Sequence, residues 1–398
     1  MAFWKKRVYA DAAAATPLSP IARTELIRLL GLYGNAGALH QEGVAAHAAL
    51  ETARTTIATA IGAHADEIIF TGNGTEGNNL AIQGSIRPLL SQHGEVHAIT
   101  SVIEHQSVLE PLHALERDGL YTTLLGVDGE GLIDPQELAA AMNSETVCIS
   151  IQLVNSEIGT VQPIKEIAKE VRRIRKQRNE EGNTLPLYFH CDASQAPLWI
   201  PLHMDALGVD FLTLDGQKVL GPKGVGALFV RRGCTLEPLL FGGSQERGLR
   251  GGTPNVPLAG SFALALKEAQ AHATERSERV EKVRNQLFFD IQQYLPTAVL
   301  NGPQFAHRVA NNLNISIPGL EGETGVIALD VEGIAASTRS ACSVQEDTVS
   351  HVLAALRVPL EEARGAIRLT LLPDVTVADA HAIVHGLIRV AKRYKSVV

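Results

Sequence analysis

The sequence predicts an α/β protein in which a mostly parallel β-sheet lies between helices, joined to a smaller α+β domain. Short apolar segments alternate with longer amphipathic ones from about residue 20 to residue 255, as in repeated βαβ units. The short segments are apolar throughout, which is typical of strands covered on both faces. After Pro257 this alternation ends, without a low-complexity linker. We therefore expect a large domain at residues 20–256 and a small α+β domain at residues 1–19 and 257–398.

The individual elements follow from the same patterns in chain order. Short apolar runs predict strands at residues 67–71, 96–100, 146–152, 187–191, 210–214 and 226–230. Longer amphipathic runs predict helices at residues 44–61, 75–90 and 163–178. In the small domain we expect one long charged helix at 258–293, strands at 311–317 and 366–372, and helices at 348–356 and 377–394.

Composition narrows the classes of function. The chain has 398 residues and a formal net charge of −8, which argues against a nucleic-acid partner or binding to an acidic membrane surface. No apolar run reaches the roughly 18 residues of a membrane span, and no long apolar segment follows the basic residues near Met1. Four cysteines without paired spacing favour free thiols, no metal site and a cytoplasmic location.

A lysine and an aspartate each stand at the end of a predicted strand. Lys218 comes soon after the strand at residues 210–214, and Asp192 directly follows the strand at residues 187–191. Pyridoxal 5'-phosphate (PLP) needs such a pair, because its aldehyde forms a Schiff base with an amine and a carboxylate keeps its pyridine nitrogen protonated. The alternative is a solvated loop lysine and an aspartate in a turn. The pair alone therefore makes PLP one hypothesis among others.

A glycine-rich turn supports a phosphate site. The segment Gly72-Asn73-Gly74-Thr75-Glu76-Gly77 follows a predicted strand and begins a predicted helix. Backbone N–H groups and the helix dipole hold phosphate at such positions, so Gly74 and Thr75 are candidate ligands. A nicotinamide-binding Rossmann unit has a similar turn, but it needs an acidic residue at the end of the next strand. That strand ends in Ile99-Thr100-Ser101, which favours a single phosphate over a dinucleotide.

Three more polar residues accompany predicted strands. His105 follows the strand at residues 96–100 on the expected carboxyl edge of the sheet, where ligands bind, although it could equally be a hydrogen-bonding residue. Asn155 follows the strand at residues 146–152 and could form a turn. Arg368 lies within an apolar strand, where a guanidinium is costly unless paired. It could make a structural ion pair or clamp a substrate carboxylate.

One cysteine stands apart from the other three. Cys148 and Cys191 lie within apolar strand segments and are expected to be inert core thiols. Cys234 follows a turn. Cys342 lies in a small polar segment, and the nearby Arg339 could raise its thiolate fraction. Cys342 could therefore be a nucleophile, although a single exposed cysteine is more often incidental than catalytic.

These segments belong to an ordered set that covers most of the chain. The set comprises Val8 to Asp11, Thr16-Pro17, Asn35, His40, Gly43, Thr71 to Glu76, Asn79 to Ala81, Glu104-His105, Val154 to Gly159, His190 to Gln195, Gly221 to Gly224, Glu246 to Gly248, Arg250 to Asn255 and Ser340 to Ser343. In order and spacing it resembles the NifS/IscS-like cysteine desulfurases, in the class V aminotransferase family of fold-type I PLP enzymes. Each segment is a weak signal alone, whereas the ordered set is specific.

The resemblance implies roles toward the cofactor. Lys218 would bind PLP and move the substrate α-proton, and Asp192 would pair with the pyridine nitrogen. Gln195 would bond the ring hydroxyl, and His105 would stack on the ring and assist proton transfer. The phosphate would be held by Thr75 and by Thr253 of a neighbouring subunit in a homodimer. The residues of this chain themselves add two candidate phosphate donors, Gly74 and Gln217.

The resemblance also implies a reaction. Asn155 and Arg368 would hold the carboxylate of L-cysteine, and Cys342 would take its sulfur as a persulfide, leaving L-alanine. A sulfur-acceptor protein, such as an iron–sulfur scaffold, would receive it for cluster assembly or tRNA thiolation. The alternatives are a selenocysteine lyase, another class V lyase or aminotransferase, and, from a different class, a non-catalytic scaffold.

The chain departs from the family pattern beside its lysine. The family usually has Ser-x-His-Lys there, and its Ser and His donate to the phosphate, whereas this chain has Asp215-Gly216-Gln217-Lys218. Gln217 can still donate a hydrogen bond, but an ionised Asp215 can only accept. We therefore expect the Asp215 carboxylate to turn away from the phosphate, toward a cation or backbone N–H groups.

Overall fold

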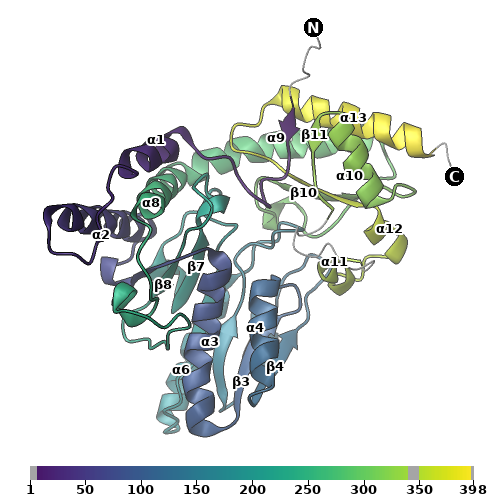
Figure 1. Cartoon of the computed structure of the whole chain (residues 1–398). Coiled ribbons are helices and arrows are strands. Elements are labelled where there is room, and N and C mark those ends of the chain that lie inside the picture. Colours follow the sequence, from purple (N-terminus) through teal and green to yellow (C-terminus); the bar gives the residue numbers. More distant parts are fainter. Residues whose placement is uncertain (1–6, 339–348, 396–398) are drawn as a thin grey trace.

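A seven-stranded sheet forms the centre of the larger part of the molecule in this computed structural model, which describes residues 7–338 and 349–395 (Figure 1). Its strands lie in the order β2-β8-β7-β6-β5-β3-β4. They are β2 (Ile68–Thr71), β3 (Val96–Ser101), β4 (Leu120–Leu125), β5 (Thr146–Ser150), β6 (Tyr188–Asp192), β7 (Phe211–Asp215) and β8 (Gly226–Val230). Only β8 runs against its neighbours within this sheet. The mostly parallel sheet that the sequence predicts is confirmed.

Strand β4 is the one strand of this sheet that the sequence analysis missed. The six predicted strands all belong to the sheet, with ends within two residues of the predicted ones. Strand β4 lies at the edge of the sheet and pairs with β3 alone. Its side chains Tyr121 and Leu124 are exposed, so it lacks the continuous apolar run that marks a strand covered on both faces.

Helices cover both faces of the large sheet. Helices α3 (Gly74–His93) and α4 (Gln106–Glu116) pack on one face, and α2 (Gln41–Ile61), α6 (Ile164–Glu180) and α8 (Val256–Ala271) pack on the other. Successive strand residues therefore enter different cores: Phe211 packs with α3, whereas Leu212 packs in the core that includes α6 and α8. Three short helices complete this part: α1 (Pro20–Leu29), α5 (Pro135–Ala141) and α7 (Met204–Leu207).

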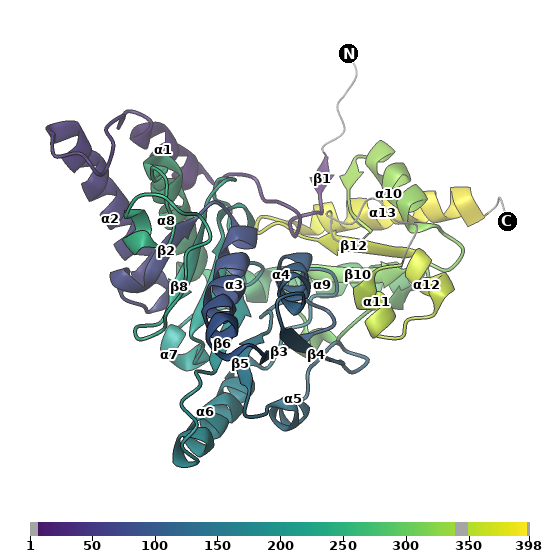
Figure 2. The ribbon, with the colours of Figure 1, turned by 60° about the horizontal axis from the view of Figure 1, so that its bottom comes forward.

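A second, smaller part is built around an antiparallel sheet in the order β12-β10-β9. Its strands are β9 (Val299–Leu300), β10 (Asn312–Ser316) and β12 (Ala366–Thr370). Its helices are α9 (Ala273–Tyr294), α10 (Gly322–Val331), α11 (His351–Ala355), α12 (Leu360–Arg364) and α13 (Val377–Lys395). Figure 2 shows this part beside the larger one, with α13 lying along the small sheet. It has the α+β character that the sequence predicts.

The single long helix predicted at residues 258–293 is wrong, because the structure has two helices there. They meet at His272, whose N–H bonds to the carbonyl of Gln270 and so interrupts the helical ladder. Helix α8 packs against α1 and α2, whereas α9 packs against α13 and β10. The two helices therefore pack against different neighbours, one in the larger part and one in the smaller part. The predicted domain boundary at residue 257 falls at the start of α8. The break between α8 and α9 at His272 is an alternative position for this boundary.

The start of the chain joins the smaller part. Strand β1 (Val8–Tyr9) pairs in parallel with β11 (Ile334–Ala335), and Asp11 forms an isolated bridge with Thr370 of β12. From there the chain passes to the larger part, so residues 10–16 lie between the two sheets (Figure 2). Among residues 7–338 and 349–395, no helix combines the length and apolar composition needed to cross a bilayer.

A buried ion pair fixes the loop that precedes α8. Both carboxylate oxygens of Glu246 accept hydrogen bonds from Arg54 of α2, each at 2.7 Å, and one also accepts from the N–H of Phe70 at 2.8 Å. Glu246 and Arg247 have φ angles of 46° and 57°, a left-handed conformation that costs energy for residues other than glycine. The ion pair offsets this cost and holds the loop on α2.

Replacing Glu246 with Ala should lower the free energy of unfolding by about 3–5 kcal/mol, because the buried Arg54 guanidinium loses its buried carboxylate and keeps only Glu51 and the carbonyl of Ile68. Urea denaturation at a fixed protein concentration measures the change. Asp66→Ala is the matched control, because Asp66 makes the same two-bond contact to Arg232 at the surface and should matter much less. Equal effects of the two substitutions would contradict this account.

Candidate active site

Eight of the predicted site residues meet in one cavity at the carboxyl edge of the large sheet. Its volume is about 170 Å³. The predicted residues in its wall are Gly74, Thr75, His105, Asp192, Gln195, Gln217, Lys218 and Arg368. They come from the ends of β2, β3, β6 and β7 and from β12 of the smaller part, so the cavity lies where the two parts meet.

Strand pairing brings Lys218 to Asp192. Strands β6 and β7 pair in parallel with Asp192 opposite Thr213, so both strands end at the same edge. A 3-10 turn at Gly216–Lys218 follows β7 directly and turns the lysine toward the cavity. Lys218 Nζ donates to the carbonyl oxygens of Ala13 and Ala14 at 2.5 and 2.6 Å. The amine is thus held at a defined place in the cavity wall.

The Asp192 carboxylate is oriented by neighbours on both oxygens. It accepts hydrogen bonds from Asn78 Nδ2 at 2.7 Å and from the N–H of Ser194 at 2.9 Å. Asn78 also donates to Ser107 Oγ at 2.8 Å, and its own Oδ1 is buried without a partner among the described residues. The sequence analysis missed Asn78, although its position one turn after Gly74 on α3 puts both residues on the same helix face.

His105 is held as a neutral ring. It is the N-cap of α4, and its Nδ1 accepts from the N–H of Ser107 at 3.1 Å. Because a backbone N–H can only donate, the proton of a neutral ring is on Nε2. Burial lowers the pKa of His105 below its usual value, against the opposing effect of Asp192. A neutral imidazole can therefore lie against an aromatic cofactor ring and exchange a proton through Nε2.

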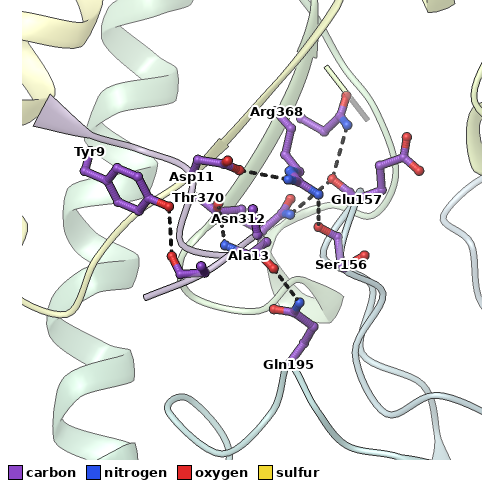
Figure 3. A network of polar contacts seen from close by, with 12 residues as sticks. Tyr9, Asp11, Ala13, Ser156, Glu157, Gln195, Asn312, Arg368 and Thr370 are labelled. Atoms are coloured by element: carbon purple, nitrogen blue, oxygen red, sulfur yellow. Dashed lines mark hydrogen bonds and ion pairs between the residues drawn. The ribbon is translucent and has the colours of Figure 1, made fainter. Parts of the chain in front are cut away.

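The sequence left two alternatives open for Arg368, a structural ion pair and a clamp for a substrate carboxylate, and the structure has features of both. The side chain is 1% exposed, and its Nη2 pairs with Asp11 Oδ1 at 2.8 Å, while Nη1 donates to the carbonyl of Ser156 at 3.3 Å (Figure 3). Its Nε has no hydrogen-bond partner among the described residues. The guanidinium is thus a structural ion-pair member, and the same side chain also lines the cavity, where it could clamp a carboxylate.

Gln195 lies beside the same network. Its Nε2 donates to the carbonyl of Ala13 at 2.9 Å, the carbonyl that also accepts from Lys218 (Figure 3). Asp11 was missed by the sequence analysis, because its only signal is that a buried Arg368 needs an acidic partner. Residues 11–14 therefore contact the lysine, the glutamine and the arginine of the site.

Asn155 and Thr253 do not reach this cavity within the chain, and Cys342 lies outside the described residues. Asn155 Oδ1 accepts from the N–H groups of Glu157 and Ile158, each at 2.9 Å, and its Nδ2 donates to the carbonyl of Ile103 at 3.0 Å. These bonds favour the turn interpretation of Asn155. Thr253 is exposed and lines a different hollow.

The start of α3 forms the anion end of the cavity. Gly74 is the first residue of the helix, and a Cβ there would lie 2.9 Å from Ser194 Oγ, so the turn admits no side chain. Asp215 Oδ2 accepts from the Gly74 N–H at 3.3 Å, and Asp215 Oδ1 accepts from the Gln217 N–H at 3.1 Å. Asp215 thus bonds backbone N–H groups, as expected, but the expectation that it turns away from the phosphate position is not met. One of these groups, the Gly74 N–H, is the donor expected to hold the phosphate.

The residues present fit PLP. An amine and an oriented carboxylate lie in one wall, a neutral histidine lies beside them, and a helix N-terminus supplies backbone donors for an anion. The buried, partnerless Asn78 Oδ1 is further evidence that the cavity is shaped for a polar molecule.

Comparison with known proteins agrees with this geometry. The sequence model of the class V aminotransferase family matches residues 8–383. A curated relative, cysteine desulfurase IscS of Dictyoglomus turgidum, is 41% identical over 99% of this chain and 96% of its own length.

Two solved structures share the fold and add to the comparison. A NifS-like protein superposes with a TM-score of 0.88 at 30% identity, over 97% of this chain and 100% of that one. The structure of SspA in complex with cysteine gives a TM-score of 0.77 at 34% identity, over 92% of this chain and 99% of that one. The chain belongs to the class V aminotransferase family of PLP-dependent enzymes and, within it, to the NifS/IscS-like cysteine desulfurases.

Proposed function

We propose that this enzyme converts L-cysteine to L-alanine and takes the released sulfur on Cys342. The observation that carries the proposal is the meeting of Lys218, Asp192 and Arg368 in one cavity. When bound, PLP supplies an electron sink that stabilises negative charge on the substrate Cα. Cysteine and the Cys342 thiol together give alanine and a Cys342 persulfide, so the reaction needs no external oxidant or reductant.

Lys218 and His105 are the residues that would transfer the α-proton of the substrate. Lys218 Nζ is held by two carbonyl groups, and it is the amine that would bind the cofactor and move the α-proton of the substrate. His105, neutral and with its proton on Nε2, would lie against the ring and assist the transfer. Asn78 and Ser194 keep Asp192 in place as the partner of the pyridine nitrogen.

Arg368 would hold the carboxylate of cysteine. Its charge is already balanced by Asp11, so a substrate carboxylate would join an existing pair. Asn155 does not line the cavity, and its amide already bonds backbone groups through both its oxygen and its nitrogen. Arg368 is therefore the stronger candidate for substrate binding.

Cys342 remains the best candidate for the nucleophile. Burial raises the pKa of the other three thiols, to about 12 for Cys148 and Cys234 and well above the usual value for Cys191. None of these three lines the cavity. The residues on either side of the segment containing Cys342 are held near the cavity: Ser337 exchanges backbone hydrogen bonds with Arg368, and His351 Nε2 lies 3.0 Å from the carbonyl of Glu104.

A homodimer would complete the site. Large apolar side chains are exposed around α1, the start of α2 and the loop before α8; they are Ile27, Leu30, Tyr33, Leu39, Val44, Leu240 and Phe241. Such a patch marks a protein interface. Thr253 lies in the same loop and would reach the phosphate of the second subunit, which accounts for its absence from the cavity of its own chain.

The proposed acceptor of the sulfur is a protein such as an iron–sulfur scaffold, serving cluster assembly or tRNA thiolation. The free thiols Cys148, Cys191 and Cys234 fit a cytoplasmic location. Selenocysteine lyase is the nearest alternative activity. Selenide release from selenocysteine at a rate far above sulfide release from cysteine would favour it.

Peptide mapping after borohydride reduction should place the pyridoxyl group on Lys218. Lys218→Ala should lower alanine formation by at least about 10²–10⁴-fold, because both the attachment point and the proton carrier are lost. Lys223→Ala is the matched control, since Lys223 is an exposed lysine five positions away, and it should leave both readouts unchanged. A pyridoxyl group on Lys223 would overturn the assignment.

Replacing Cys342 with Ala should leave the absorbance of bound PLP and the spectral change on adding cysteine intact, while alanine formation is lost. The reason is that the substrate would still bind, but its sulfur would have no acceptor. Cys234→Ala is the control and should keep full turnover. Wild-type turnover by Cys342→Ala in the presence of a thiol acceptor would point to another nucleophile.

Replacing Phe241 with Glu should convert the dimer to monomers, because it places a charge within the exposed apolar patch. Sedimentation velocity measures the change, and PLP affinity should fall with it as Thr253 of the partner is lost. Val331→Glu is the control, since Val331 is equally exposed on α10 but lies outside the patch. A wild-type protein that sediments as a monomer would contradict the proposed interface.

A further inference from the structure

The Asp215 carboxylate already occupies the anion end of the cavity. It is 7% exposed and lies at the end of β7, facing the first turn of α3. Besides the N–H groups of Gly74 and Gln217, it accepts from the side-chain amide of Gln217 at 3.4 Å. The aspartate therefore uses the donors that the start of a helix offers to an anion.

A phosphate held at the start of α3 would need the same donors. This step rests on the proposed function, in which Gly74, Thr75 and Gln217 hold the phosphate of PLP. The Gly74 N–H is a single donor, and a Cβ there would come within 3.2 Å of Asp215 Oδ2, so little space separates the two anionic groups. An ionised carboxylate and a phosphate dianion at this separation repel each other.

The charged groups around Asp215 do not offset a second anion. The charges of Lys218 and His105 couple to Asp215, but Lys218 offers at most one positive charge, and its nitrogen is less basic once it binds an aldehyde. Asp192 and Arg368 line the same cavity, and Arg368 is already paired with Asp11. Glu76 of α3 is paired with Arg250, at 3.0 Å. Burial raises the pKa of Asp215 above its usual value, opposed by Lys218 and the hydrogen bonds, so the carboxyl group is prone to take up a proton.

We propose that Asp215 binds the cofactor phosphate as a carboxylic acid, donating its O–H to a phosphate oxygen while the Gly74 N–H passes from the carboxylate to the phosphate. The proton comes from solvent when the cofactor enters. Asp215 is then a hydrogen-bond donor in the bound state and an internal occupant of the phosphate site in the free state. The binding of phosphate and of one proton are thereby coupled.

The coupling has a definite sign. At a pH below the pKa of Asp215 in the free protein, the carboxyl group is already protonated. Its ionisation then makes no contribution to the pH dependence of cofactor affinity. Above that pKa, each unit of pH should weaken binding by about tenfold, because one proton must be taken up. Neutral side chains at the same position bind no proton, and Asn always has an N–H donor.

The test compares apoprotein of the wild type with Asp215→Asn and Asp215→Ser, after circular dichroism has confirmed that each variant is folded. The dissociation constant of PLP is measured by absorbance titration from about pH 5 to pH 9, a range that brackets carboxyl groups of raised pKa. The ionisation of the phosphate affects all three proteins alike, so the ratio of wild-type to variant constants reports on Asp215 and the groups coupled to it. This ratio should be near one at low pH and rise by up to about tenfold per unit as the pH increases.

Pyridoxal, which lacks the phosphate, is the matched ligand. With pyridoxal the ratio should stay constant across the pH range, because no phosphate meets Asp215. Calorimetry in buffers of different ionisation enthalpy should show about one more proton taken up with PLP by the wild type than by Asp215→Asn, at a pH where the free carboxylate is ionised.

Three results would overturn the proposal: a ratio for PLP that does not change with pH, weaker PLP binding by both variants at every pH, or the same pH-dependent ratio with pyridoxal. They would show that Asp215 turns aside as an anion, that its role is structural, or that it acts elsewhere in the cavity. Failure of the proposed function itself would give a different result. If neither the wild type nor the variants bound PLP at any pH, the placement of the cofactor itself would be wrong.

Discussion

The parallel pairing of β6 with β7 is the constraint on which the site depends. It sets Asp192 opposite Thr213 and leaves Lys218 one short turn beyond the end of β7. A shift of one residue would turn Asp192 to the opposite face of the sheet, away from the cavity. The apolar side chains that alternate with the polar ones, Phe189 and Cys191, are fully buried in the core, so the hydrophobic core fixes the register that the chemistry needs.

The sequence predicted those site residues whose positions depend only on the strand that precedes them. Lys218, Asp192, His105 and Gly74 each lie at the end of a strand or within four residues after it. Parallel strands bring such positions together, so the sequence was enough to place them in one cavity. The contact of Asp11 with Arg368 joins the beginning of the chain to its last strand. No periodic pattern in the sequence predicts a contact between residues so far apart in the chain. A buried arginine indicates only that it needs an acidic partner, not which residue that partner is.

Other elements escaped prediction because tertiary contacts decide them. The break at His272 depends on which neighbours α8 and α9 meet, not on their amphipathic pattern, which is continuous across the break. Asn78 lies on a buried face of α3, where its amide is satisfied mainly by Asp192 and Ser107 from two other elements. Asn155 differs from these residues. It follows a strand, as a site residue would, but its side chain accepts hydrogen bonds from the backbone of its own turn.

The segment at residues 11–14 links the cofactor end of the cavity to the substrate end. Its carbonyl groups bond Lys218 and Gln195, and its one carboxylate pairs with Arg368. It is also tied to β12, since the N–H of Ala13 donates to Thr370 Oγ1 at 2.9 Å (Figure 3). The lysine amine and the guanidinium are thus both bonded to one short segment of backbone. In the proposed function, the smaller part would thereby hold a substrate carboxylate at a fixed place relative to the lysine that must reach its Cα.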